Sequence, residues 1–211
     1  MSGEIPAERM ELFLELRAVL VTVCEEYGGV REGFDSVASL DSMSAPKAQD
    51  VGDTVSLLGG AALSITPFLA RFFEARNAAL LDANMSMEEY AYIYAVSYHD
   101  HLLSPETRNE IFSDGQALSP ETSQMLKECM ARQLEALRLV DVEGAQGQAV
   151  EMELQRMDTD PSWLVWQDGL PASIGASLTP YRERLDHLFC GAAAGLEMER
   201  SARRALRTAL E

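Results

Sequence analysis

The sequence predicts an all-α protein, a single-domain helical bundle of six to eight helices that takes in all 211 residues. Three observations support this prediction. No segment shows the sustained apolar and polar alternation with β-branched enrichment that is typical of strands. Apolar residues instead recur three and four positions apart, as on one face of a helix. Five of the eight prolines directly follow a serine, threonine or aspartate, a pattern typical of a helix start behind its N-cap.

The first helix is predicted over residues 6–27, with the pair Gly28-Gly29 as its stop. Its apolar residues are helically spaced: Leu12, Leu16, Val19, Leu20, Val23 and Tyr27. From residue 30 the periodicity fades into a stretch rich in serine, aspartate and glycine. Residues 30–53 are therefore predicted to form a flexible connection, with room for one short helix.

Three further helices are predicted in close succession, over residues 54–63, 67–82 and 87–103. The pair Thr66-Pro67 marks the start of the second, because proline at the first helical position loses no hydrogen bond. The stretch Ser86-Met87-Glu88-Glu89 is a capping box, in which Ser86 and Glu89 satisfy each other's backbone donors. The third helix is apolar or aromatic nearly all round, so a central buried position is expected.

The second half of the chain is predicted to begin with a brief helix over residues 105–113 and a long one over 120–142. The apolar stripe of the long helix requires a partner helix. Two alternatives stay open at Gly144 and Gly147: the helix continues to Met157, or the two glycines break it. A final helix is predicted over residues 180–210, with arginines near its C-terminal end.

The charge balance argues against two classes of partner. The chain has 34 acidic and 17 basic residues, a net charge of -17 and an isoelectric point near 4.5. Phosphate backbones and anionic lipid surfaces would be repelled, so no nucleic acid and no membrane is expected as a partner. The longest uncharged run, residues 54–70, contains Gly59, Gly60 and Pro67, which argues against a membrane-spanning helix.

Cysteine usage and the N-terminus indicate a cytoplasmic protein, although a signal peptide already removed from a longer precursor is an open alternative. The first residues contain no basic run followed by an apolar stretch. Cys24, Cys129 and Cys190 are too scattered for a disulfide framework. Each is expected to be a small buried hydrophobic residue, with a reactive thiol as the alternative.

No cofactor and no metal site is predicted. On a helix, His99 and His101 point about 200° apart, so they cannot bind one ion together. Neither these histidines nor His187 follows a glutamate by three positions, as di-iron bundles require. The Gly-x-Ser-x-Gly, Walker and Gly-x-Gly-x-x-Gly motifs are all missing from the sequence. Whether the protein is an enzyme, and which residues would then be catalytic, stays open.

The predicted ligand-binding residues are Tyr90, Tyr94, Tyr98 and His101, which share one arc of the helix over residues 87–103. Their polar tips need partners, because the helix is expected to be buried. Those partners are either neighbouring protein groups or a bound ligand. His99 falls on another face of the helix and is expected to be a hydrogen-bonded core histidine.

Two other segments have alternative interpretations. Trp163 and Trp166 either anchor the core or form an exposed docking patch. The small residues 191–195 allow close helix packing, either within the fold or across a homodimer.

Together these observations predict a non-catalytic helical binding or protein-interaction module, with a protein or a small molecule as its partner. The alternative is a small-molecule-binding sensor or enzyme whose pocket is lined by the tyrosine arc, with His101 as acid or base.

Overall fold

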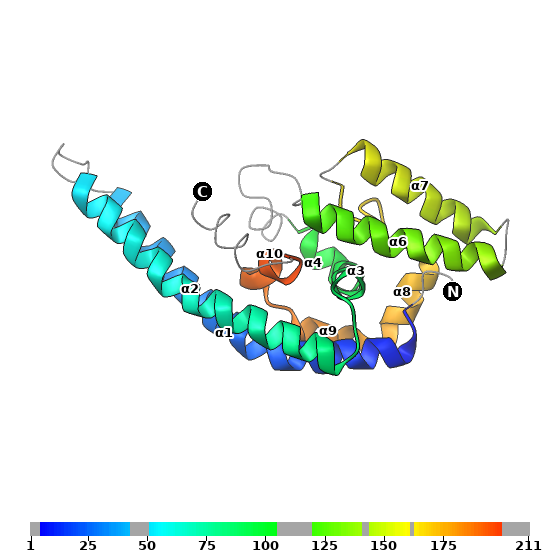
Figure 1. The fold of residues 1–211 in the computed structure, drawn as a ribbon, viewed down its shortest axis with the longest axis horizontal. Helices are drawn as coiled ribbons and strands as arrows, with labels where there is room; N and C mark the ends of the chain where they lie inside the picture. Colours follow the sequence, from blue (N-terminus) through cyan, green and yellow to red (C-terminus); the bar gives the residue numbers. More distant parts are fainter. Residues whose placement is uncertain (1–4, 43–50, 105–119, 141–143, 161–162, 200–211) are drawn as a thin grey trace.

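The computed structural model describes residues 5–42, 51–104, 120–140, 144–160 and 163–199, and within them every regular element is a helix (Figure 1). The predicted all-α class is confirmed. The elements are α1 (Ala7–Ser42), α2 (Val51–Asp82), α3 (Met87–Ser97), α4 (His99–Leu102), α6 (Pro120–Val140), α7 (Ala145–Thr159), α8 (Ala172–Leu178), α9 (Arg182–Leu188) and α10 (Ala194–Glu197), with 3-10 turns at Thr179–Tyr181 and Gly191–Ala193.

The helices α1 and α2 form a long hairpin that extends beyond the rest of the molecule (Figure 1). The predicted stop at Gly28-Gly29 is wrong, because α1 continues to Ser42. Glycine weakens a helix interior by about 1 kcal/mol per residue but does not by itself end the helix. The predicted connection over residues 30–53 is therefore helical at both of its ends, and residues 43–50 lie outside the described residues.

The predicted division of residues 54–82 into two helices is also wrong. α2 is one helix from Val51 to Asp82 with Pro67 in its interior. An interior proline costs about 3 kcal/mol, but the next turns bury Leu69, Phe72 and Phe73 in the core. This packing offsets the hydrogen bond that Pro67 cannot donate.

The chain turns directly after α2, at residues 83–85, where Asn84 adopts a left-handed conformation with φ of 45°. The backbone N–H of Met85 donates to the Leu80 carbonyl (2.9 Å), and that of Asn84 donates to the Leu81 carbonyl (3.1 Å). This is the Schellman arrangement, which asparagine tolerates better than most residues. The reversal places Ser86 at the start of the next helix.

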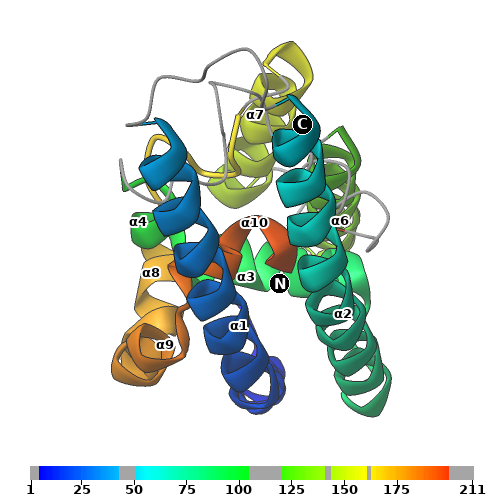
Figure 2. The same ribbon diagram turned by 90° about the vertical axis from the view of Figure 1, so that its left-hand side faces the viewer.

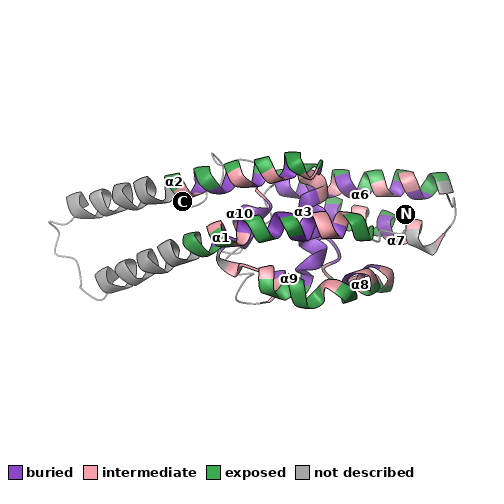
Figure 3. Ribbon diagram, turned by 90° about the horizontal axis from the view of Figure 1, so that it is seen from below, coloured by how far each residue is buried: buried purple, intermediate pink, exposed green. Residues whose placement is uncertain are grey.

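α3 crosses the hairpin and forms the centre of the core (Figure 3). Every residue from Tyr90 to Ser97 is buried, so the predicted central position is confirmed. Half of the predicted capping box is confirmed, since Ser86 Oγ accepts a hydrogen bond from the Glu89 N–H (3.2 Å), whereas the Glu89 carboxylate binds Arg9 and not the Ser86 N–H. The predicted single helix over 87–103 is interrupted at Tyr98, whose φ and ψ of -108° and 20° separate α3 from α4.

The long helix α6 packs against α3 on one side and α7 on the other, so its apolar stripe has the expected partners. The continuous alternative for residues 120–157 is wrong. α6 ends at Val140, and α7 begins after Gly144 and runs back alongside α6 (Figure 1). The helix predicted over residues 105–113 lies outside the described residues.

The predicted final helix over residues 180–210 is wrong where the structure describes it. α9 ends at Leu188, and Phe189 and Cys190 are extended before the chain turns into α10. The break brings the Phe189 ring against Tyr98 and His101, with ring centroids 5.1 and 4.4 Å apart. α10 then lies between α1 and α2 (Figure 2). Residues 200–211 lie outside the described part of the chain.

Candidate functional site

Three of the four predicted site residues lie together in the core. Tyr90, Tyr94 and Tyr98 are fully buried, and their rings follow one another with centroids 6.1 and 4.8 Å apart. The four-residue spacing puts them on one face of the α3 segment, as predicted. That face is covered by α1 and by residues 188–197.

The tyrosine face meets a buried ion pair between α1 and α10. Arg17 Nη1 binds Glu197 Oε1, and Arg17 Nη2 donates to the Leu188 carbonyl (2.8 Å). Tyr90 donates its hydroxyl to Glu197 Oε2 (2.5 Å). The Arg17 guanidinium also lies 5.3 Å from the ring centroid of Tyr94. Protein groups therefore pair the Tyr90 hydroxyl, whereas the Tyr94 and Tyr98 hydroxyls are buried without a hydrogen-bond partner among the described residues.

Burial keeps the phenols of this cluster neutral. It raises the pKa of Tyr90 and of Tyr94 well above the ordinary value, and the nearby Glu197 carboxylate adds to the shift. Burial alone would lower the pKa of Arg17, but Glu197 and the tyrosines raise it well above its usual range. The centre of the protein therefore holds the Arg17–Glu197 ion pair beside protonated phenols.

His101 lies at the protein surface beside Tyr98, with ring centroids 6.4 Å apart. Its side chain is 42% exposed, and its Nε2 lies 3.1 Å from Asp186 Oδ1. The imidazole stacks on the Phe189 ring, with an interplanar angle of 17°. His101 is therefore held by two neighbours from the C-terminal segment.

His99 is a hydrogen-bonded core histidine, as predicted. Its Nε2–H donates to the Trp166 carbonyl (2.7 Å). The other polar groups of Trp166 are also paired, since its backbone N–H donates to the buried Glu153 carboxylate and its Nε1–H donates to Tyr92 Oη (3.3 Å). Trp166 has a φ of 61°, a strained value for a non-glycine residue that these three contacts hold in place.

Trp166 therefore anchors the core. Trp163 is partly buried, donates to Glu153 Oε1 (2.7 Å) and packs its ring under Arg156. The interpretation of the tryptophans as core anchors is correct for Trp166, and Trp163 lies at the edge of the core.

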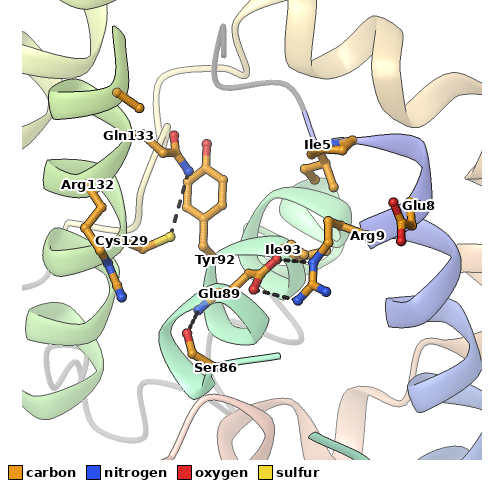
Figure 4. Close-up of a pocket in the computed structure, with 12 residues that line it drawn as sticks. Ile5, Glu8, Arg9, Ser86, Glu89, Tyr92, Ile93, Cys129, Arg132 and Gln133 are labelled. Carbon is orange, nitrogen blue, oxygen red and sulfur yellow. Dashed lines mark hydrogen bonds and ion pairs between the residues drawn. The ribbon is translucent and has the colours of Figure 1, made fainter. Parts of the chain in front are cut away.

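A cavity of about 520 Å³ lies on another side of α3, where this helix meets the start of α1 and the middle of α6 (Figure 4). Its floor is mainly apolar and its rim is charged. The lining residues are Ile5, Pro6, Glu8, Arg9, Ser86, Glu89, Tyr92, Ile93, Cys129, Arg132, Gln133 and Ala136. None of the four residues predicted as a ligand site is among them.

The rim of the cavity is fixed by an ion pair with two hydrogen bonds. Arg9 donates from Nε and Nη2 to the two carboxylate oxygens of Glu89, at 2.6 and 2.7 Å (Figure 4). Glu89 therefore binds α1 with its carboxylate, while its backbone N–H serves the Ser86 cap. Bidentate pairs of this kind are geometrically specific, so the rim is preorganised.

The wall of the cavity carries one unpaired acceptor. Gln133 donates from Nε2 toward Cys129 Sγ (3.8 Å), whereas its Oε1 is buried and accepts no hydrogen bond from the described residues. Tyr92 presents its ring to the cavity, and burial raises the pKa of its phenol to about 12. An acceptor buried without a donor costs about 1–3 kcal/mol, and a rotation of the Gln133 amide toward the cavity would let an occupant with an N–H or O–H group remove this cost.

Sequence reasoning missed both Arg17 with Glu197 and the residues of this cavity. A signal for Arg17 is present: Phe13, Arg17, Leu20 and Cys24 follow helical spacing, which places a charged residue within an apolar stripe. The cavity residues come from three segments far apart in the sequence. No local pattern brings them together.

No protein-family model matches the chain, and no curated protein or solved structure is significantly similar to it. Across the described residues, no group of three or more His, Cys, Asp or Glu side chains is arranged to hold a metal ion. No helix in this part of the chain combines the length and apolar character needed to cross a membrane.

Proposed function

We propose that the protein is a non-catalytic helical binding module, and that the cavity between α1, α3 and α6 is its binding site. The observation that carries the proposal is the unpaired Gln133 Oε1 in the wall of a cavity of about 520 Å³. Cavities that bind small molecules have volumes of roughly 300–1,000 Å³, with apolar walls and a few placed polar groups.

The lining residues define the chemistry of the ligand. The ring of Tyr92 and the side chains of Ile5 and Ile93 offer apolar contact. Gln133 Oε1 is the acceptor for one hydrogen bond from the ligand. The Arg9–Glu89 pair borders the opening, and its two charges neutralise each other. The proposed ligand is a small, mainly apolar molecule with one N–H or O–H donor.

The side chains of the cavity favour binding over catalysis. Burial raises the pKa of the Cys129 thiol to about 11, so the sulfur is protonated near neutral pH and is a poor nucleophile. Glu89 is occupied by Arg9, and no histidine is among the lining residues. Apart from Glu8, the cavity therefore offers no evident acid, base or nucleophile.

The proposal is tested with N-phenyl-1-naphthylamine, an uncharged apolar fluorophore that carries one N–H donor. Its fluorescence is excited where tryptophan does not absorb and is titrated with the full chain. Saturable binding at one site per chain is expected. Gln133→Leu removes the acceptor and is expected to raise Kd about fivefold, the equivalent of about 1 kcal/mol for one hydrogen bond.

A matched pair of variants on α6 tests the location. Ala136 lines the cavity and Ala131 is exposed on the same helix. Ala136→Trp is expected to abolish saturable binding, while Ala131→Trp leaves Kd unchanged. His101→Ala is also expected to leave Kd unchanged. Equal binding by both tryptophan variants, or loss of binding in His101→Ala, would contradict the proposed site.

A further inference from the structure

Two of the three cysteines lie side by side in the structure, although they are far apart in the sequence. Cys24 lies on α1, and Cys190 lies in the extended break between α9 and α10. α1 packs against the 3-10 turn that directly follows Cys190, and the two thiols interact with each other. The third cysteine, Cys129, lies on α6 against the other side of the core.

The two thiols have unequal access to reagents. Cys24 is fully buried, and its Sγ donates to the buried Glu197 Oε1 (3.2 Å). Cys190 is only partly buried. A small reagent can therefore reach Cys190 first, whereas Cys24 lies in the core.

The pKa values of the two thiols also differ, and the more accessible thiol has the lower pKa. The hydrogen bond from Cys24 and the N–H of Ala193 outweigh burial and lower the pKa of Cys190 to about 7. The contact with Cys190, burial and the nearby Glu197 raise the pKa of Cys24. The accessible sulfur is thus the nucleophilic thiolate near neutral pH, and the buried sulfur is the protonated partner.

We propose that Cys190 is a thiol modification site for small disulfides, and that Cys24 resolves the adduct into a Cys24–Cys190 disulfide. Cys190 thiolate attacks one sulfur of the reagent R–S–S–R, which forms Cys190–S–S–R and releases R–S⁻. Cys24 then attacks the Cys190 sulfur, its proton passes to the leaving thiolate, and a second R–SH departs. The protein loses two electrons and two hydrogens, and the reagent is reduced to two thiols.

The product would join α1 to the break between α9 and α10. That break is already held to α1 by the bond from Arg17 to the Leu188 carbonyl. The disulfide would therefore add a covalent link between two segments that already pack against each other. It would close a loop that contains α2, α3 and α6.

The test uses the reduced full chain and bis(2-hydroxyethyl) disulfide, which is uncharged and is not repelled by a chain of net charge -17. Reaction is stopped with acid and intact masses are measured. The wild type is expected to lose about 2 Da after a transient gain of about 76 Da. A digest without reductant should then yield the Cys24 peptide linked to the Cys190 peptide.

Variants separate the two steps. Cys24→Ser keeps a hydrogen-bond donor beside Cys190 but cannot form a disulfide, so it is expected to accumulate the adduct of about 76 Da on Cys190. Cys190→Ala is expected to remain unmodified on the same timescale. Cys129→Ala, the control, should behave as the wild type. A persistent adduct in the wild type, modification of Cys129 at an equal rate, or an unreactive Cys24→Ser protein would overturn the proposal. None of these outcomes depends on the cavity that binds the proposed ligand.

Discussion

Removing Arg17 tests the role of the buried ion pair at the centre of the molecule. Arg17→Met keeps most of the length of the side chain and removes its charge. The Glu197 carboxylate would then be fully buried with only Tyr90 and Cys24 as hydrogen-bond donors. The Leu188 carbonyl would lose its bond to Arg17 as well.

The size of the effect follows from this burial. Removal of one partner from a buried pair costs about 3–5 kcal/mol. Because Tyr90 and Cys24 still donate to Glu197, we expect Arg17→Met to lower the free energy of unfolding by about 3 kcal/mol. In Arg17→Met/Glu197→Met no unpaired charge remains, so the double variant is expected to be more stable than Arg17→Met.

The assay is equilibrium unfolding in urea, followed by far-ultraviolet circular dichroism. Arg184→Met is the matched control, because Arg184 forms an exposed pair with Glu11 at 2.8 Å, and its loss should cost less than about 1 kcal/mol. The reasoning is refuted if Arg17→Met costs no more than Arg184→Met, or if the double variant is less stable than Arg17→Met.

Two other perturbations have defined outcomes. Glu153→Leu removes the carboxylate that binds the Trp166 N–H, so it should lower the free energy of unfolding by about 2–4 kcal/mol. The control Glu151→Leu removes an exposed carboxylate and should lower it by less than about 1 kcal/mol. Both are measured by urea unfolding, and equal losses would contradict the anchoring role of Glu153. In an alkaline titration followed by tyrosinate absorbance, the buried tyrosines of residues 90–98 should ionise only as the chain unfolds. Burial raises the pKa of Tyr92 in the folded protein to about 12, so the neutral Tyr92 phenol stabilises the fold below pH 10, and this contribution is lost between about pH 10 and pH 12. Reversible ionisation of all these tyrosines near pH 10 in the folded protein would contradict their burial.

Local sequence patterns predicted those parts of the fold that depend on local chemistry. The helix class followed from apolar spacing, and the start of α3 followed from the N-cap at Ser86. The predicted stop at Gly28-Gly29 and the predicted start at Thr66-Pro67 were wrong, because the glycines and the proline each impose a local cost that the surrounding helix outweighs. The opposite error occurred at Phe189 and Cys190, where the chain breaks directly before Gly191 and packing of the Phe189 ring favours the break.

The candidate sites were likewise predicted only where they depend on residues close together in the sequence. The shared face of Tyr90, Tyr94 and Tyr98 follows from their spacing on one helix. Their partner Glu197 comes from another part of the chain, so no periodicity indicates it. Of the predicted helical apolar stripe on α1, Leu16 and Leu20 are buried but Val19 is 57% exposed, because the buried stripe passes instead through Arg17.

The position of α10 between α1 and α2 bears on the order in which the chain folds during synthesis. Arg17 on α1 and Arg76 on α2 both bind this short C-terminal segment: Arg76 Nη1 donates to the carbonyls of Leu196, Glu197 and Glu199 at 3.2, 3.1 and 2.7 Å. Both arginines are made long before residues 188–199 leave the ribosome. Until then neither has its native partner, so the hairpin can form its helices early but cannot complete its core. Final consolidation is therefore a late event governed by long-range contacts, and a chain halted before residue 196 would hold two arginines that must stay hydrated.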